Sequence, residues 1–174
     1  MQSLRPGSSG KNPRPTGVVR AAKSLKSSVM QKKILIALLL VFVAIQFIRP
    51  ARNVSDQATP NEIGLHEQVP DEVRTILKHS CYDCHSNNTV YPWYINLQPV
   101  GWWMQWHVND GKHHLNFSEF GGYSEKKAKD KYKDIDEVVS NGEMPLDSYV
   151  WLHRDTRLTP DQSKTVADWA KGLK

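Results

Sequence analysis

The hydrophobic pattern of the chain is dominated by one run, residues 34–48 (ILIALLLVFVAIQFI), in which Gln46 is the only polar side chain. Its fifteen residues are fewer than the roughly 20 that usually cross a bilayer as a helix. Basic side chains at both ends, Lys33 and Arg49 among them, extend the usable length because they reach toward lipid headgroups. We therefore predict a signal anchor that spans the membrane as one N-terminal helix, with a cleaved secretory signal as the alternative.

The segment before this run, residues 1–33, holds eight Lys or Arg residues and no Asp or Glu. It is also rich in Ser, Gly and Pro, a composition that buries too little apolar surface to fold, so we predict a disordered basic arm. Positive charge on one side of an apolar span favours the cytoplasm for that side. We therefore expect residues 50–174 to be exported.

The pattern after the run changes to polar residues bounded by prolines. Residues 49–69 contain few apolar positions and no helical spacing, which is typical of a linker. We expect the folded domain to occupy residues 70–174.

The domain is predicted to open with a helix over residues 70–80. Pro70 suits the first helical position, and the acidic side chains of Asp71 and Glu72 favour the N-terminal end of the helix dipole. The apolar residues of this segment share one face and are expected to be buried: Val73, Ile76 and Leu77.

Two more helices are predicted nearer the C-terminus. The first begins at Ser124, a good N-cap, and ends at Asn141-Gly142, a left-handed C-cap signal. The second begins with Thr159 and Gln162, the spacing of a capping box. The expected buried stripes are Ala128, Tyr132, Ile135 and Val139 on the first helix, and Val166, Trp169, Ala170 and Leu173 on the second.

Aromatic residues are frequent in residues 91–120, between the helix predicted over residues 70–80 and the helix that begins at Ser124. A further helix is predicted to start near Pro99, in "PVGWWMQWHVND". The chain contains no convincing alternating strand pattern and no internal repeat. The predicted class is all-α: a cytochrome c-like helical domain with long loops, preceded by one membrane helix.

The formal charge of +5 belongs to the basic arm and not to the domain. Without the eight positive charges of residues 1–33, the remainder carries −3. The arm has no interleaved aromatics and no groove-reading module, so we do not expect nucleic-acid binding. No phosphate-binding loop or nucleophile elbow is present either.

The chemistry of the chain centres on "SCYDCHS", which contains its only two cysteines, Cys81 and Cys84. C-x-x-C followed by His85 is the attachment signature of c-type haem. Three alternatives fit the same letters: a redox-active dithiol, half of a zinc site and a simple disulfide. The dithiol is less suited to an exported chain and a motif preceded by a helix, and the histidines that zinc would need have no familiar spacing. These candidates are His66, His107, His113 and His114.

The spacing of the motif matches haem chemistry. Haem carries vinyl groups on two adjacent pyrroles, and two intervening residues let Cys81 and Cys84 each form a thioether from one turn of backbone. His85 then lies beneath the iron as the proximal axial ligand. We interpret the motif as the site of one covalent haem c with its iron.

The second axial ligand is predicted to be Met144, in the loop "NGEMPLDSY" after the helix that starts at Ser124. Pro145 stiffens this loop, and Glu143 is expected to face outward because an unpaired carboxylate beside a haem is costly. Met144 as a core methionine and His107 as a rival ligand are the alternatives.

Three long motifs carry a resemblance to a known family: "CYDCHSNNTVYPWYINLQPVGWW", "HVNDGKHHLNFSEF" and "GEMPLDSYVWLHRDTRLT". Over about residues 65–172 the chain resembles the haem-binding domain family of exported bacterial proteins, common in Bacteroidota. The resemblance implies a covalent c-type haem, and with the anchor it implies a domain in the periplasm, tethered to the bacterial inner membrane.

Two functions follow from this sequence. The first is a monohaem cytochrome c that passes single electrons between redox partner proteins and is not an enzyme. The second is a haem enzyme, peroxidase-like, or a ligand sensor with an open or weakly held sixth iron position. The histidines available as distal groups for the second function are His107, His113, His114 and His153.

Overall fold

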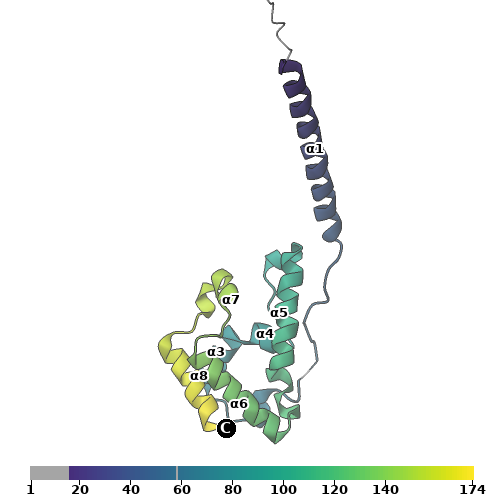
Figure 1. Ribbon diagram of the computed structural model, residues 1–174. Coiled ribbons are helices and arrows are strands. Elements are labelled where there is room, and N and C mark those ends of the chain that lie inside the picture. The colour runs from purple at the N-terminus through teal and green to yellow at the C-terminus, as the bar shows by residue number, and fades with distance from the viewer. Residues whose placement is uncertain (1–15, 58) are drawn as a thin grey trace, which may run out of the picture. The chain divides into compact units, whose positions relative to one another are not determined.

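The computed structural model describes residues 16–57 and 59–174, with side chains from residue 28 onward (Figure 1). The chain divides into two units, Met1–Phe47 and Ile48–Lys174. All regular structure in the described ranges is helical, which confirms the all-α prediction.

The first unit contains helix α1, Thr16–Ile45. Its Ser28–Ile45 segment is long and apolar enough to cross a membrane. The helix begins well inside the arm that we expected to be disordered, so that expectation is wrong from residue 16; residues 1–15 lie outside the described residues. Alanines, lysines and a leucine follow Thr16, and these good helix formers extend a helix that the apolar run has already nucleated.

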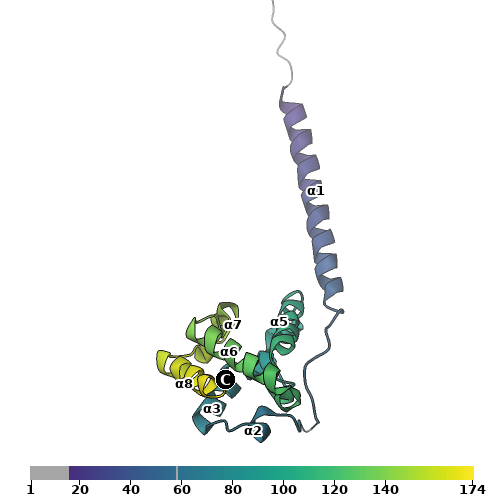
Figure 2. The ribbon, with the colours of Figure 1, turned by 60° about the horizontal axis from the view of Figure 1, so that its bottom comes forward.

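Helices α6 (Glu125–Ser140) and α8 (Pro160–Gly172) pack side by side and hold the core of the second unit. Figure 1 shows them adjacent, and Figure 2 shows α6 between α8 and the aromatic helix α5 (Val100–His114). Both predicted caps are confirmed: the Ser124 side chain accepts from Lys127 N, and Thr159 forms a capping box with Gln162.

Both predicted stripes face the core. Tyr132 and Trp169 meet edge to face with ring centroids 5.6 Å apart, and each such buried side chain contributes about 1.5–3 kcal/mol. Helix α3, Asp71–Ser80, adds the predicted apolar face. The buried core residues of these helices are Val73, Ile76, Leu77, Tyr132, Ile135, Val139, Val166, Trp169 and Ala170, with Ala128 and Leu173 partly buried beside them.

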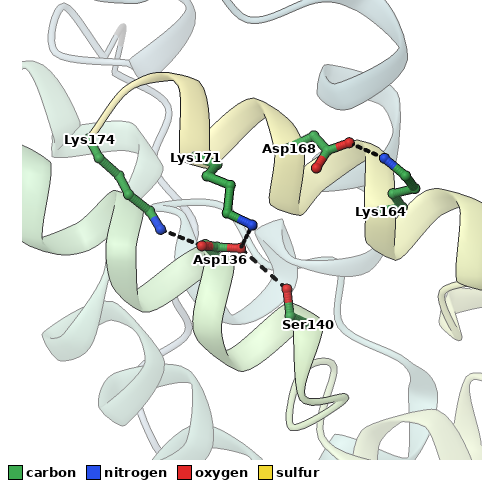
Figure 3. Close-up of polar contacts among 6 residues, drawn as sticks. All are labelled: Asp136, Ser140, Lys164, Asp168, Lys171 and Lys174. Carbon is green, nitrogen blue, oxygen red and sulfur yellow. Dashed lines mark hydrogen bonds and ion pairs between the residues drawn. The ribbon is translucent and has the colours of Figure 1, made fainter.

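Asp136, on α6, interacts with two lysines at the C-terminal end of the chain, Lys171 on α8 and Lys174 just after it (Figure 3). Its carboxylate accepts a hydrogen bond from Lys174 and from Ser140 Oγ at 3.2 Å, and Lys171 Nζ lies 3.9 Å away. The hydrogen bond from Lys174 is the main reason that the pKa of Asp136 is lowered. Lys164 and Asp168 form a separate ion pair within α8, also drawn in Figure 3.

Residues 49–69, predicted to be a linker, are part of the folded unit in the structure. Its second half forms helix α2, Ile63–His66, and Ile63 is 1% exposed in the core cluster. In its first half the Asn53 side chain donates to Ser86 O and Thr89 Oγ1. The folded unit therefore starts near Ile48 and not at residue 70. The scattered apolar residues of this polar stretch were too weak a periodic signal to predict this packing.

Shorter elements complete the second unit, and one of them contains the cysteine motif. These are α4 (Tyr82–His85), the 3₁₀ turn η1 (Trp93–Asn96), η2 (Phe117–Gly122), α7 (Asp147–Leu152) and η3 (Arg154–Thr156). The helix predicted to start near Pro99 is confirmed as α5, for which Pro99 is the N-cap.

Candidate functional site

The cysteine motif forms a single helical turn. Cys81 ends α3 and caps α4, and its carbonyl accepts hydrogen bonds from Cys84 N at 3.2 Å and His85 N at 3.0 Å. Residues three apart in a helix share a face, so the two thiols are offered from one side of the turn. This is the local geometry that the C-x-x-C spacing predicts.

A cavity of about 370 Å³ opens beside this turn, within the usual range of cofactor sites. Helices α3, α4, α5 and α6 and the loop before α7 all contribute to its wall. The predicted site residues that line it are Cys81, Cys84, His85, His107 and Met144. The structure therefore brings together side chains that lie up to 63 positions apart in the chain.

His85 is held in one orientation by the backbone. Its Nδ1 lies 3.0 Å from the carbonyl oxygen of Leu115, which can only accept, so Nδ1 carries the proton and Nε2 carries the lone pair. The Phe117 ring packs against the imidazole edge with centroids 6.3 Å apart. Burial lowers the pKa of His85, which leaves a neutral imidazole at pH 7, the form that binds metals.

Both thiols are free and protonated. Burial raises the pKa of Cys81 to about 12 and that of Cys84 to about 11. Thiols with raised pKa values are poor redox nucleophiles, which disfavours the dithiol alternative. The zinc alternative lacks its other ligands, because no group of three or more His, Cys, Asp or Glu side chains in residues 28–57 and 59–174 is placed to hold a metal ion.

Met144 reaches the cavity from the end of α6. Gly142 adopts a φ of 72°, the left-handed conformation predicted for this cap. The backbone N–H groups of Glu143 and Met144 then both donate to Val138 O, at 2.8 and 3.2 Å, which turns the chain back over the helix end. Met144 is partly buried at the cavity, and Glu143 is exposed as expected.

His107 lines the same cavity from α5. Its ring lies between Trp103 and Trp106, with centroids 4.6 and 4.8 Å away. Its Nε2 is buried, and it has no hydrogen-bond partner among the described side chains and backbone. A buried nitrogen without a partner is costly and is explained when a ligand or water completes it. Both candidates for the sixth position are thus present at one cavity.

The other histidines are less central. His114 lines the cavity but is exposed and lies 3.7 Å from Asp110, while His113 is exposed beside it. His153 lines a smaller neighbouring cavity, where its Nε2 is 3.0 Å from the hydroxyl of Tyr94.

Gly111 is a site residue that the sequence reading missed. A Cβ added there would lie 2.7 Å from the backbone oxygen of Cys84 and 3.1 Å from its Cβ. Only glycine lets α5 approach the cysteine turn this closely. An isolated glycine inside a helical pattern is the signal that pointed to such a contact, since it weakens a helix by about 1 kcal/mol relative to alanine.

Asp83, inside the C-x-x-C, was also missed. One carboxylate oxygen accepts from Val90 N at 2.9 Å and the other from the Tyr149 hydroxyl at 2.7 Å. Burial and this bond to Asp83 raise the pKa of Tyr149 above its usual range, so Tyr149 stays a donor. Asp83 therefore ties the cysteine turn to the following loop and to α7, which continues the Met144 loop.

The loop after His85 is fastened by polar side chains of the second long motif. Asn87 N donates to Ser118 Oγ at 3.0 Å, and Asn116 Nδ2 donates to Asn87 Oδ1 at 2.9 Å. Asn87 Nδ2 also donates to Glu119 at 2.7 Å. These bonds give a structural reason for the letters "HSNN" and "NFSEF", which the sequence alone left unexplained.

The apolar wall of the cavity is formed by side chains other than tryptophan. Leucines and Tyr149 do line it: Leu77, Leu115, Leu146 and Tyr149. The tryptophans do not, and Trp93 and Trp106 are 75% and 59% exposed. Aromatic richness in this segment was therefore a poor guide to the cavity.

The residues present fit a haem. Two thiols on one turn, a neutral imidazole oriented through Nδ1 and a methionine thioether line one largely apolar cavity. Searches of curated proteins and of solved structures find no match to the chain. The model of a haem-binding domain family matches residues 40–172, which begins before the residue 65 expected from the motifs and includes the packed segment before α3. With more than three quarters of its length matched, the chain belongs to the haem-binding domain family.

Proposed function

We propose that this chain is a membrane-tethered periplasmic cytochrome with one covalent haem c, which passes single electrons between redox partner proteins. The observation that carries the proposal is the common cavity of Cys81, Cys84, His85 and Met144. Membership of the haem-binding domain family supports the cofactor, and α1 supports the tether.

Attachment would use the two thiols as they stand. Cys81 and Cys84 would each hold the haem by one carbon–sulfur bond, formed by addition of the S–H across a vinyl group, with the hydrogen on the other vinyl carbon and no oxidant consumed. Cys81 and Cys84 offer both sulfurs from one turn, and Gly111 allows α5 to close over that turn. When bound, the haem supplies an iron that cycles between two oxidation states.

The chain's part in electron transfer would be to supply two ligands to the iron, His85 and Met144, and to restrict water. His85 is fixed through its bond to Leu115 O, and Met144 is delivered by the capped end of α6. A methionine opposite a histidine favours a higher potential than two imidazoles. A carrier needs no further catalytic group, and the apolar wall of the cavity supports this role.

A haem enzyme or ligand sensor is the second candidate, and one observation favours it. The buried Nε2 of His107 lacks a partner at the cavity, and a distal imidazole is the group that would bond a ligand on iron. The two candidates differ in whether the sixth position is filled.

The distinguishing experiment uses the full chain, produced with haem-attachment machinery. A carrier should titrate reversibly as a one-electron couple, show the weak long-wavelength band of a methionine–ferric haem bond, and bind carbon monoxide slowly. Rapid carbon monoxide or cyanide binding, or turnover of peroxide, would instead support the enzyme or sensor.

Location is tested separately with reporters fused after Lys174. A reporter active only outside the cytoplasm should give signal, and one active only inside should give none, because eight basic residues precede the span. The opposite pattern would overturn the orientation, and a mature N-terminus just after Ile48 would overturn the anchor.

A further inference from the structure

Large apolar side chains are exposed together on η1, the first half of α5 and α7. We name this set the tryptophan face; it comprises Val90, Trp93, Leu97, Val100, Trp103, Trp106, Trp151 and Leu152. Trp93 and Trp151 are each 75% exposed, so these side chains are not part of the core. Single exposed apolar residues are normal, but a set of this size marks a surface that contacts something.

The tryptophan face is one surface and not scattered residues. Val100, Trp103 and Trp106 recur every third residue on one side of α5. Val90, Trp103 and Leu152 line the same small cavity, which joins α5 to α7. Figures 1 and 2 both show the first turns of α5 and helix α7 toward the same end of the domain.

This part of the chain is also uncharged. Residues 84–109 contain no Asp, Glu, Lys or Arg, although residues 49–174 contain 33 of them. Arg52 lies beside η1, where its guanidinium donates to Asn96 Oδ1 at 2.9 Å. Tryptophan is enriched at the headgroup level of bilayers, where arginine meets lipid phosphates, so the composition suits a membrane interface.

The chain connection brings this face to the membrane. Trp102 Nε1, on α5, donates to the carbonyl of Ile48 at 2.7 Å. Ile48 lies three residues after Ile45, the end of the span, and three residues reach at most about 10 Å. The Ile48 carbonyl that accepts from Trp102 is therefore within about 10 Å of the point where α1 ends, whatever the direction of α1.

We propose that the tryptophan face lies in the interfacial layer of the same bilayer that α1 crosses, so that the domain rests on the membrane in one orientation. The inference rests on the proposed membrane tether. It commits to lipid as the occupant because an aromatic surface, most of it from the uncharged residues 84–109, is tied to the chain just after the end of a membrane helix.

Photo-crosslinking tests this with the full, haem-loaded chain. The protein is reconstituted into vesicles of phosphatidylcholine and phosphatidylglycerol, a fraction of which carries a diazirine in the acyl chain near the headgroup. Peptide mass spectrometry then locates cross-linked lipid. We expect adducts in residues 34–48 and in residues 90–108. The triple variant Trp93→Ser, Trp103→Ser, Trp106→Ser should lose most adducts in residues 90–108 and keep those of α1.

Leu65 provides the matched control. It is 70% exposed on α2, away from the tryptophan face, so its peptide should carry no adduct and Leu65→Ser should change nothing. Adducts in residues 34–48 without any in residues 90–108 would overturn the inference and leave the tether intact, as expected if the face binds a protein instead. Absence of adducts in residues 34–48 would overturn the tether itself.

Discussion

The α6–α8 pair and the part of the domain built on α4, α5 and α7 differ in composition and in packing. In α6, ten of the 16 residues are charged, and in α5 only two of the 15 are. The α6–α8 pair has capped ends, apolar stripes turned inward and charges turned outward. The part built on α4, α5 and α7 has exposed tryptophans, the cysteine side of the cavity that it shares with α6, and a buried histidine nitrogen without a partner in the described structure.

The difference shows what each part is built for. The α6–α8 pair has capped helix ends and buries the apolar stripes of both helices in one core that also includes α3. The α4–α5 part leaves space and unsatisfied groups where a cofactor fits, and apolar side chains where a second surface fits. Departures from folding rules of this kind concentrate at functional sites.

The strongest test of this comparison is loss of the proximal ligand. His85→Ala should abolish or sharply reduce the amount of haem-loaded protein, because the iron loses its oriented imidazole. His114→Ala is the matched control, since His114 lines the same cavity but is exposed. Haem staining of denatured protein measures the result, and normal loading of His85→Ala would remove His85 from the site.

Gly111→Ala, in the α4–α5 part, should lower the free energy of unfolding more than a glycine substitution in the α6–α8 part. The added methyl group would lie 2.7 Å from Cys84 O, and relief of such overpacking costs about 1–3 kcal/mol. Gly172→Ala, at the end of α8, meets nothing within 4 Å and should be neutral or slightly stabilising. Denaturant unfolding of the haem-loaded chains gives both values; equal midpoints would mean that α5 does not need this close approach.

Met144→Ala sharpens the assignment of the sixth ligand. We expect a lower reduction potential, on the order of 0.1 V within the roughly 0.8 V that axial ligands span, with faster carbon monoxide binding and intact thioethers. Met104→Ala, which alters the smaller cavity only, and His107→Ala should change the potential little. If His107→Ala gave the large shift and Met144→Ala none, His107 would be the ligand.

The smallest effect is expected in the α6–α8 part. Its hydrogen bond from Lys174 lowers the pKa of Asp136, so the folded state binds fewer protons than the unfolded state. The resulting stability is present above the ordinary Asp pKa of about 3.9 and is lost as pH falls through the lowered value. Asp136→Asn should reduce the loss of unfolding free energy at acid pH, measured from unfolding curves. Asp168→Asn is the control, because Asp168 forms only an exposed i,i+4 ion pair with Lys164, and it should leave this pH dependence unchanged.

Sequence reasoning succeeded where structure is local. Helices α6 and α8 were predicted with their caps, and α3 with its buried face, because an amphipathic stripe and a capping side chain are local signals. The C-x-x-C-H turn is local in the same way. Even Gly142 carried a readable signal, since its φ of 72° suits glycine.

The remainder depends on contacts distant in sequence. Ile63 looked like part of a linker because one buried residue has no periodicity, and Gly111 gains its role only when α5 meets Cys84. The exposure of Trp93, Trp103 and Trp106 was not predicted, because composition does not say which side of a helix is covered. Tertiary packing decides each of these cases.

The central claim is that Cys81 and Cys84 hold one haem covalently. Intact mass spectrometry of the full chain after acid–acetone extraction tests it most directly. The account predicts a mass equal to the chain plus one haem, retained after extraction, and the unmodified chain mass for Cys81→Ser with Cys84→Ser. Release of the haem by extraction, or a haem that stays bound to the double variant, would contradict the account.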